Sequence, residues 1–281
     1  MAADEQSGGR DKARIEMASE RLESHAQRAK EAIQNDQKIV PPFWINKYKK
    51  DASRNWDIFY KRNTTKFFKD RYWLDREFEE LAHKGDSDEK KICLEVGCGV
   101  GNFVFPTIAK NPNLFIYACD FSSRAIEMVK ANEQYVESRC KAFVCDLTAD
   151  DLCNTIPSET ADLVSAIFVL SAIPPEKMSF AIQNIFKVLK HGGSVLFRDY
   201  GLYDEAQIKF SSASDKKLDE NFYVRQDGTM SYFFSLEDVQ SRFEAEGFQT
   251  ISNEYIYRET TNRKLEMNAD RIFTQCKFVK P

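Results

Sequence analysis

The fold is decided by the stretch Ile92-Cys93-Leu94-Glu95-Val96-Gly97-Cys98-Gly99-Val100-Gly101-Asn102. Its apolar run leads into a glycine-rich turn, which is typical of a buried strand followed by a tight turn and a helix. A second apolar run, residues 114–119, ends at Asp120. Glycines after one strand and a carboxylate after the next are how a doubly wound sheet holds a nucleoside. We therefore expect a nucleoside site where these two segments meet.

The rest of the chain alternates between apolar runs and amphipathic segments. The pattern predicts strands at 91–96, 114–119, 141–145, 162–168 and 194–199, and helices at 102–109, 122–132, 176–190 and 235–246. Ser122 is a candidate N-cap, and Gly192 is the expected exit of the fourth helix. Two further strands are expected at 248–257 and 270–279, and a hairpin at 221–234 that turns at Asp227-Gly228. This order predicts an α/β fold with a seven-stranded, mostly parallel sheet and helices on both faces.

The chain divides into three regions by composition. Residues 1–40 form a charged tail, which we expect to be partly helical or disordered. Residues 41–88 carry aromatics among basic residues, and we expect them to form an N-terminal helical extension. Residues 89–281 form the main α/β domain, with the 220–234 hairpin inserted in it.

Composition excludes several classes of protein. The apolar runs are too short for a membrane span, and the acidic N-terminal region is unlike a secretory or transit peptide. Seven cysteines without a C-x-x-C pair are typical of buried thiols in a reducing compartment. The three histidines are not spaced with cysteines as zinc ligands would be, so we expect no metal. A net charge of −4 argues against indiscriminate coating of nucleic acid.

Three successive strand ends carry residues that suit S-adenosylmethionine. Gly97 and Gly99 let the backbone approach a ligand, and Asp120 can accept hydrogen bonds from both ribose hydroxyls. Asp146, after the third strand, suits the exocyclic amine of adenine, and Ile167 or Phe168 could pack on its face. Together they form the pattern of a Rossmann-like class I methyltransferase. A purely structural turn and an NAD enzyme are the alternatives, although the glycine spacing does not match a dinucleotide fingerprint.

The chain resembles the eukaryotic tRNA 3-methylcytidine methyltransferases from about residue 54 to its end. The resemblance rests on several motifs, which are 55–61 (Asn-Trp-Asp-Ile-Phe-Tyr-Lys), 67–71 (Phe-Phe-Lys-Asp-Arg), 94–102, 119–122, 167–172, 197–201, 221–225 and 275–278. It implies methyl transfer from S-adenosylmethionine to N3 of cytidine 32 in the tRNA anticodon loop. The sequence of residues 198–204 is most similar to the cytoplasmic branch, which acts on serine tRNAs with seryl-tRNA synthetase. The resemblance therefore implies a cytoplasmic protein, with the nucleus as a further compartment. The arginine/threonine-tRNA branch is the alternative, and a non-catalytic RNA- or synthetase-binding module is another.

The resemblance also implies roles for individual residues. The implied cofactor set is Trp56, Tyr60, Gly97, Asp120, Asp146, Leu147 and Ile167, with Trp56 and Tyr60 closing as a lid. Spacing alone would equally fit a helix that packs on the core, because Trp56, Phe59 and Tyr60 share one helical face.

The acceptor side is expected to use residues after the fifth strand and in the basic segment. Asp199 is the candidate for stabilising the cationic product, beside Arg198, and Tyr200 could stack on or orient the base. An ion pair between Asp199 and Arg198, or a helix cap, is the structural alternative. The expected RNA contacts are Lys69, Arg71, Phe67, Phe68 and Arg225, since basic residues suit phosphates and aromatic rings suit unstacked bases. The alternative is a solvated helix with a buried aromatic stripe.

Overall fold

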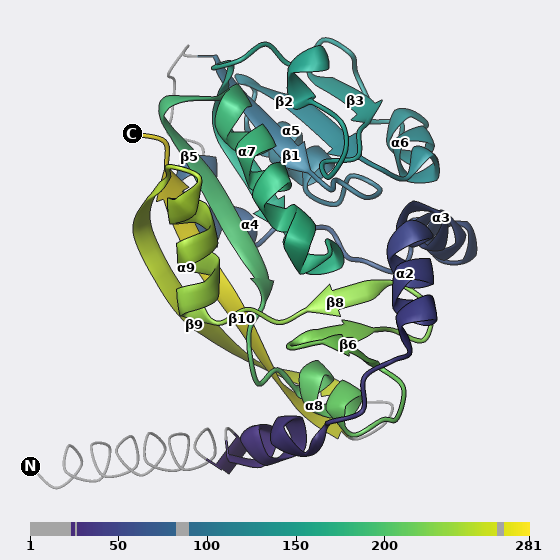
Figure 1. The fold of residues 1–281 in the computed structure, drawn as a ribbon. Helices are drawn as coiled ribbons and strands as arrows, with labels where there is room; N and C mark the ends of the chain where they lie inside the picture. The colour runs from purple at the N-terminus through teal and green to yellow at the C-terminus, as the bar shows by residue number, and fades with distance from the viewer. Residues whose placement is uncertain (1–23, 26, 83–89, 263–266) are drawn as a thin grey trace, which may run out of the picture.

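A seven-stranded sheet organises the molecule (Figure 1). The computed structural model describes residues 24–25, 27–82, 90–262 and 267–281. The strand order is β3-β2-β1-β4-β5-β10-β9; the first five strands are parallel, and β10 runs antiparallel to both of its neighbours. The strands are β1 (Lys91–Val96), β2 (Leu114–Asp120), β3 (Cys140–Val144), β4 (Ala161–Ile167), β5 (Leu189–Tyr200), β9 (Gln249–Asn262) and β10 (Met267–Val279). The predicted fold class is confirmed.

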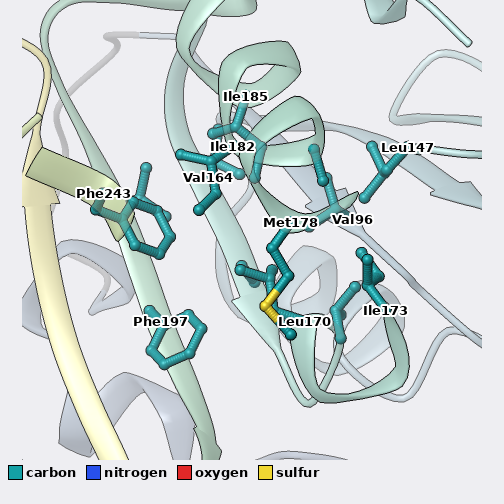
Figure 2. Close-up of a cluster of buried hydrophobic side chains, with 14 of the residues drawn as sticks. Val96, Leu147, Val164, Leu170, Ile173, Met178, Ile182, Ile185, Phe197 and Phe243 are labelled. Atoms are coloured by element: carbon teal, nitrogen blue, oxygen red, sulfur yellow. The ribbon is translucent and has the colours of Figure 1, made fainter. Parts of the chain in front are cut away.

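Helices cover both faces of this sheet, because side chains alternate along each buried strand. Leu94 and Val164 belong to one hydrophobic cluster, and Cys93 and Leu163 belong to the other. The first cluster packs under α7 (Met178–Val188) and α9 (Leu236–Ala245), which lie on the near side of the sheet in Figure 1. Figure 2 shows its centre, with Ile182 and Ile185 of α7 near Val164, and Phe197 near Phe243 of α9. The second cluster packs under α4 (Leu74–Glu77), α5 (Val104–Lys110) and α6 (Ser123–Lys130).

The sequence placed one helix boundary incorrectly. The predicted helix 176–190 ends earlier, at Val188, and β5 begins at Leu189 rather than near residue 194. Leu189 already pairs with Ala161, and the register then shifts by a bulge before Ser194 pairs with Leu163. The sequence predicts that Gly192 ends the helix, but pairing with β4 ends it earlier. Gly192, at a φ of 74°, therefore lies inside the strand. By contrast, Ser122 caps α6 as predicted, since its hydroxyl accepts a hydrogen bond from the Ala125 amide.

Two small subassemblies accompany the main sheet. The N-terminal extension forms α2 (Pro42–Lys50) and α3 (Ala52–Asn63), and residues 1–23 of the predicted tail lie outside the described part of the chain. The predicted hairpin forms as β7 (Phe222–Val224) and β8 (Met230–Tyr232), to which β6 (Lys217–Asp219) adds a third strand. The Asn55 amide of α3 donates to the Gly228 carbonyl at the hairpin turn, 2.9 Å away. Helix α3 and the hairpin are therefore neighbours.

The sequence did not predict α8 (Glu205–Ser211), which is short and begins where Asp204 accepts a hydrogen bond from the Ala206 amide. In the described segments, no helix is long and apolar enough to cross a membrane. The same segments contain no group of three or more His, Cys, Asp or Glu residues that could hold a metal ion.

Candidate cofactor and acceptor site

A cavity of about 230 Å³ lies at the carboxyl ends of β1 to β4, between these strands and α3. This edge is where parallel α/β sheets bind their ligands. The structure brings six of the eight predicted cofactor residues to its wall, which are Trp56, Tyr60, Gly97, Asp120, Asp146 and Leu147. The other two, Gly99 and Ile167, do not line it.

The glycine turn after β1 reaches the cavity wall at Gly97. Gly97 and Gly99 have φ angles of 58° and 53°, in the left-handed region where glycine carries no Cβ penalty. A Cβ on Gly97 would lie 2.7 Å from the Val169 side chain, and a Cβ on Gly99 would lie 2.9 Å from the Tyr60 hydroxyl. The backbone is thus free to approach a ligand at this turn and could not do so with larger residues.

Asp120 is held in place by the backbone around it. One carboxylate oxygen accepts from the Gly99 amide and the other from the Ser122 amide, each at 2.9 Å. Burial raises the pKa of Asp120 to about 6, and these two amide hydrogen bonds oppose the rise. Each oxygen retains acceptor capacity, because an ionised carboxylate offers about four lone-pair sites. The two oxygens can therefore receive the two hydroxyls of a ribose.

The loop after β3 forms the next part of the wall. One oxygen of Asp146 accepts from both the amide and the hydroxyl of Thr148, at 2.9 and 2.8 Å. This hydrogen bonding fixes the carboxylate beside the apolar side chain of Leu147. A carboxylate next to an apolar surface suits the amine and the ring of an adenine, as the sequence predicted for Asp146.

The wall after β4 differs from the expectation for Ile167. Its side chain is 1% exposed and packs in the core under α5 and α6. Phe168, which the sequence offered as the alternative, lines the cavity and has a positive φ of 60°. Such a conformation is strained for a bulky residue and is found mostly where surrounding contacts enforce it. Because of this backbone conformation, the Phe168 side chain does not follow the alternating in-and-out pattern of β4 and faces the cavity instead. The pattern of apolar residues in the sequence cannot predict such a change of direction.

Helix α3 covers the cavity with Trp56 and Tyr60, whose rings lie 5.8 Å apart. Asp57 of the same helix accepts a hydrogen bond from the Ser122 hydroxyl at 2.5 Å, and Ser53 donates to the Phe121 carbonyl. Burial raises the pKa of Tyr60 well above its usual value, so this hydroxyl stays protonated. Lys49 and Lys50 of α2 also line the cavity. The sequence did not predict Lys49 and Lys50 as site residues, although both belong to the basic and aromatic segment 41–88.

Asp199 lies behind the cavity wall and not in it. Its side chain is fully buried and accepts three backbone hydrogen bonds, from Val169, Ser171 and Tyr200, at 2.9 to 3.1 Å. Burial raises the pKa of Asp199 to about 6, against the effect of hydrogen bonds from Ser171 and Tyr200. Asp199 therefore holds the loop that carries Phe168 and Val169, which fits a positioning residue better than a group that touches the base.

Arg198 and Asp199 are neighbours on β5, so their side chains point to opposite faces of the sheet. The structural alternative of an ion pair between them is therefore wrong. Its guanidinium lies 3.5 Å from Glu77 of α4 and 4.4 Å from the centre of the Trp73 ring. Burial lowers the pKa of Arg198 to about 10, and Glu77 partly offsets this effect. Arg198 therefore joins the N-terminal extension to β5 and does not line the cavity. Its guanidinium also lies 5.3 Å from the centre of the Phe273 ring, which neighbours Tyr200.

Tyr200 lies in a cluster of half-buried aromatic rings beside the cavity. Its ring centre is 5.2 Å from that of Phe168 and 6.2 Å from that of Phe273. The Arg225 and Arg271 guanidiniums lie 5.4 and 5.7 Å from the Tyr200 ring centre. Arg271 is paired with Asp204 at 2.8 Å, whereas Arg225 contacts the neutral Ser231 hydroxyl at 3.4 Å. Tyr200 and Arg225 are therefore placed where a base and its phosphate could be received.

The predicted RNA residues of the N-terminal extension separate into two groups. Lys69 is exposed, and Phe67 is 58% exposed with its ring against those of Phe59 and Phe68. Arg71 instead has a side chain only 17% exposed and contacts internal groups. The prediction that Arg71 is a surface contact for RNA is therefore not supported by its position.

Taken together, the cavity residues fit an adenosine-containing ligand. The glycine turn gives close backbone approach, Asp120 offers a pair of acceptors for ribose, and Asp146 with Leu147 suits a purine. The Tyr200 cluster adjoins the same cavity through Phe168. A second reactant could therefore meet the ligand at the edge formed by β4 and β5.

Comparison with known proteins places these features in context. A family model described as a methyltransferase domain matches residues 94–195. The human tRNA N(3)-cytidine methyltransferase METTL6 is 54% identical over 252 residues, which cover 89% of this chain and 88% of the relative. The Schizosaccharomyces pombe tRNA N(3)-methylcytidine methyltransferase trm141 is 48% identical over 83% of this chain and 94% of its own. The Xenopus tropicalis tRNA N(3)-cytidine methyltransferase METTL2 is 40% identical, over 94% of this chain and 87% of its own.

Solved structures share the fold at low sequence identity. A SAM-dependent methyltransferase from Anabaena variabilis superposes with a TM-score of 0.58 at 13% identity, over 82% of this chain and 95% of its own. A SAM-dependent methyltransferase from Methanosarcina mazei gives a TM-score of 0.51 at 16% identity, over 68% of this chain and 93% of its own. These similarities concern the fold alone.

Proposed function

This chain belongs to the tRNA N(3)-cytidine methyltransferase family and is an S-adenosylmethionine-dependent enzyme that methylates N3 of cytidine in tRNA; we propose that its target is cytidine 32 in the anticodon loop of serine tRNAs. The observation that carries this proposal is the pairing of the nucleoside cavity with the aromatic and basic residues beside it, on a chain whose residues 198–204 resemble the serine-tRNA branch. An anticodon-loop base can be splayed out and read on its Watson–Crick edge, where N3 lies.

The cavity residues would hold the cofactor in a fixed orientation. Asp120 would receive the ribose hydroxyls, Asp146 the adenine amine, and the glycine turn the methionine portion, while Trp56 and Tyr60 exclude water from above. When bound, S-adenosylmethionine supplies an electrophilic methyl group on a good leaving group. The protein's part in the reaction is therefore mainly positioning and exclusion of solvent.

No general base is required for this reaction. Cytosine N3 attacks with a lone pair that is already available, and no proton has to leave before the attack. The product is cationic, so negative potential near the base is favourable. Asp199 could contribute to that potential only from behind the wall, since its oxygens are engaged by three backbone amides.

The RNA strand would cross two surfaces beside the cavity. Tyr200 would stack on the cytosine, and Arg225 would pair with a flanking phosphate. The Arg225 guanidinium lies 5.4 Å from the centre of the Tyr200 ring and donates to the Ser231 hydroxyl, so it is placed beside that stacked base. Lys69, Phe67 and Phe68 would contact more distant nucleotides, in keeping with the exposure of Lys69 and Phe67. The N-terminal extension would thus serve both as lid and as RNA platform.

Seryl-tRNA synthetase is the proposed protein partner, and the cytoplasm, with the nucleus, the proposed location. Both follow from the resemblance to the serine-tRNA branch.

A panel of purified tRNAs tests the substrate proposal. Each tRNA is incubated with enzyme and S-adenosylmethionine, with and without seryl-tRNA synthetase, and 3-methylcytidine is mapped by mass spectrometry of nuclease fragments. We expect modification at position 32 of serine tRNAs, increased by the synthetase. Modification of arginine or threonine tRNAs instead would contradict the serine assignment, and an unchanged rate with the synthetase would remove that partner.

A further inference from the structure

Arg71 lies where segment 64–70, whose residues other than Phe68 are exposed, turns into the interior. Its side chain is 17% exposed, although the neighbours Lys69, Asp70 and Tyr72 are exposed. The Arg71 amide donates to the Asn102 carbonyl at 2.9 Å, just after the glycine turn. The Asn102 amide donates in return to Asp70 at 3.0 Å and to the Phe68 carbonyl at 3.3 Å. The backbone of this segment is therefore fastened to the residue that follows the cofactor turn.

The Arg71 guanidinium reaches the carboxyl end of β4. It donates to the Ile167 carbonyl at 3.2 Å and lies 5.7 Å from the centre of the Phe168 ring. Phe168 is the residue whose strained backbone turns its ring to the cavity wall. A cation on the face of that ring and a hydrogen bond to the carbonyl before it both favour the strained conformation.

The same guanidinium faces a buried acid under the glycine turn. Glu95 is 1% exposed, and one of its oxygens lies 3.8 Å from Arg71. Its other oxygen is buried without a hydrogen-bond partner among the described residues. Glu95 precedes Gly97 by two residues on β1, so its position affects the turn directly. A buried acid with so little compensation depends strongly on Arg71, which is the one cation near it in the part of the chain that the structure describes.

We propose that Arg71 is a positioning residue that couples the RNA-facing segment 64–70 to the cofactor cavity, through Glu95 on one side and through Ile167 and Phe168 on the other. The inference rests on the proposed function, in which this segment contacts tRNA and the cavity holds S-adenosylmethionine. It differs from a surface phosphate contact, because Arg71 acts on the cofactor site even without RNA. Coupling of this kind is reciprocal, so RNA on segment 64–70 raises cofactor affinity by the same factor as cofactor raises RNA affinity.

Calorimetric titration with S-adenosylmethionine in the absence of RNA tests the proposal. The full-length chain is compared with Arg71→Ala, Arg71→Lys and two controls. Arg76→Ala removes an exposed arginine five residues further along, on α4. Lys69→Ala removes one of the two exposed lysines of segment 64–70. Thermal unfolding is measured for each variant, so that loss of the fold is distinguished from loss of the site.

We expect cofactor affinity to differ between the Arg71 variants and the two controls. Arg71→Ala weakens cofactor binding by about tenfold or more, because Glu95 loses its cation. Arg71→Lys restores part of that loss, because it keeps the charge without the planar fork. Arg76→Ala and Lys69→Ala change cofactor affinity by less than about twofold, as surface substitutions do. Adding Glu95→Gln to Arg71→Ala should restore part of the affinity, since the two residues act together.

Two results would overturn the inference. One is wild-type cofactor affinity in Arg71→Ala together with weaker RNA binding, which would make Arg71 an ordinary RNA contact. The other is an equal loss in Arg71→Ala and Arg76→Ala, which would indicate a general effect on α4. Neither result depends on which tRNA is methylated, so failure of the serine-tRNA proposal would be seen separately.

Discussion

Asp120 and Asp199 are two buried carboxylates at strand ends with different hydrogen-bond partners. Asp120 lines the cavity and accepts two amide hydrogen bonds, so it retains acceptor sites that face a ligand. Asp199 accepts three and does not line the cavity. The sequence identified both as candidates, because each follows an apolar strand. Which of them touches a ligand depends on how many amides surround it, and the sequence pattern does not carry that information.

Cofactor affinity should depend on pH through Asp120. Burial raises its pKa from 3.8 to about 6, so without ligand its protonated form stabilises the fold below pH 3.8, and this stabilisation is lost as the pH rises through 6. Ribose hydroxyls donate to the ionised form of Asp120. Cofactor affinity therefore changes with pH in the direction opposite to stability, and it falls about tenfold for each pH unit below 6. Calorimetry between pH 5 and 8 measures this, with Asp120→Asn as a variant that cannot titrate. A slope that persists in Asp120→Asn would assign the titration to another group, such as Asp199.

Asp199→Asn separates positioning from catalysis. An amide cannot accept all three backbone hydrogen bonds as a carboxylate does, so the loop carrying Phe168 and Val169 should loosen. We expect a lower melting temperature and cofactor binding weakened by about 1–3 kcal/mol, together with reduced kcat/KM. Thermal unfolding, calorimetry and single-turnover kinetics give the three quantities. A loss confined to the chemical step, with unchanged stability and cofactor affinity, would instead make Asp199 a catalytic group.

Helix α3 is the element that closes the cavity, and its role was visible in part from its aromatic spacing. The helical face of Trp56, Phe59 and Tyr60 predicted a packed helix, and the structure places Phe59 in a small cluster while Trp56 and Tyr60 cover the cavity. The seven strands of the sheet and the four helices α5, α6, α7 and α9 follow from apolar runs and amphipathic periodicity in the sequence. The short elements α4 and α8 do not, because tertiary contacts and a single cap determine them.

Trp56→Ala should open the lid while leaving the fold intact. Trp56 is half-buried and contacts Phe59 and Tyr60, so its removal exposes the cofactor site to water with little loss from the main core. We expect cofactor affinity to fall by about 1–2 kcal/mol, mainly through faster dissociation, with a melting temperature close to wild type. Stopped-flow fluorescence measures the dissociation rate. Trp44→Ala on α2 is the matched control, since Trp44 does not line the cavity; an equal effect in both variants would count against a lid.

At the scale of the whole molecule, the cofactor cavity and the exposed residues of the N-terminal extension form adjoining parts of one surface. The net charge is −4, yet residues 46–71 carry a local basic excess, so RNA binding depends on where charge is placed and not on the total. The sequence identified this basic segment but could not show that Lys69 faces solvent while Arg71 turns inward. That difference arises from Asn102, Glu95 and Ile167, which are distant in the chain.

Lys69→Ala should weaken tRNA binding and reduce its salt dependence. An exposed lysine that contacts one phosphate contributes about 0.7 to 0.9 to the slope of log K against log salt. Filter binding at several salt concentrations measures the slope, with Lys187→Ala on the outer side of α7 as a control. If both variants keep the wild-type slope, Lys69 does not contact the RNA backbone.

The most direct test of the account uses a serine-tRNA anticodon stem-loop with cytidine 32 and a matched stem-loop with uridine 32. Both are incubated with the full-length enzyme, seryl-tRNA synthetase and methyl-labelled S-adenosylmethionine, and the labelled nucleoside is identified after nuclease digestion. The account predicts labelled 3-methylcytidine from the first stem-loop and no label in the second. Equal labelling of the two stem-loops, or label on any other nucleoside, would contradict it.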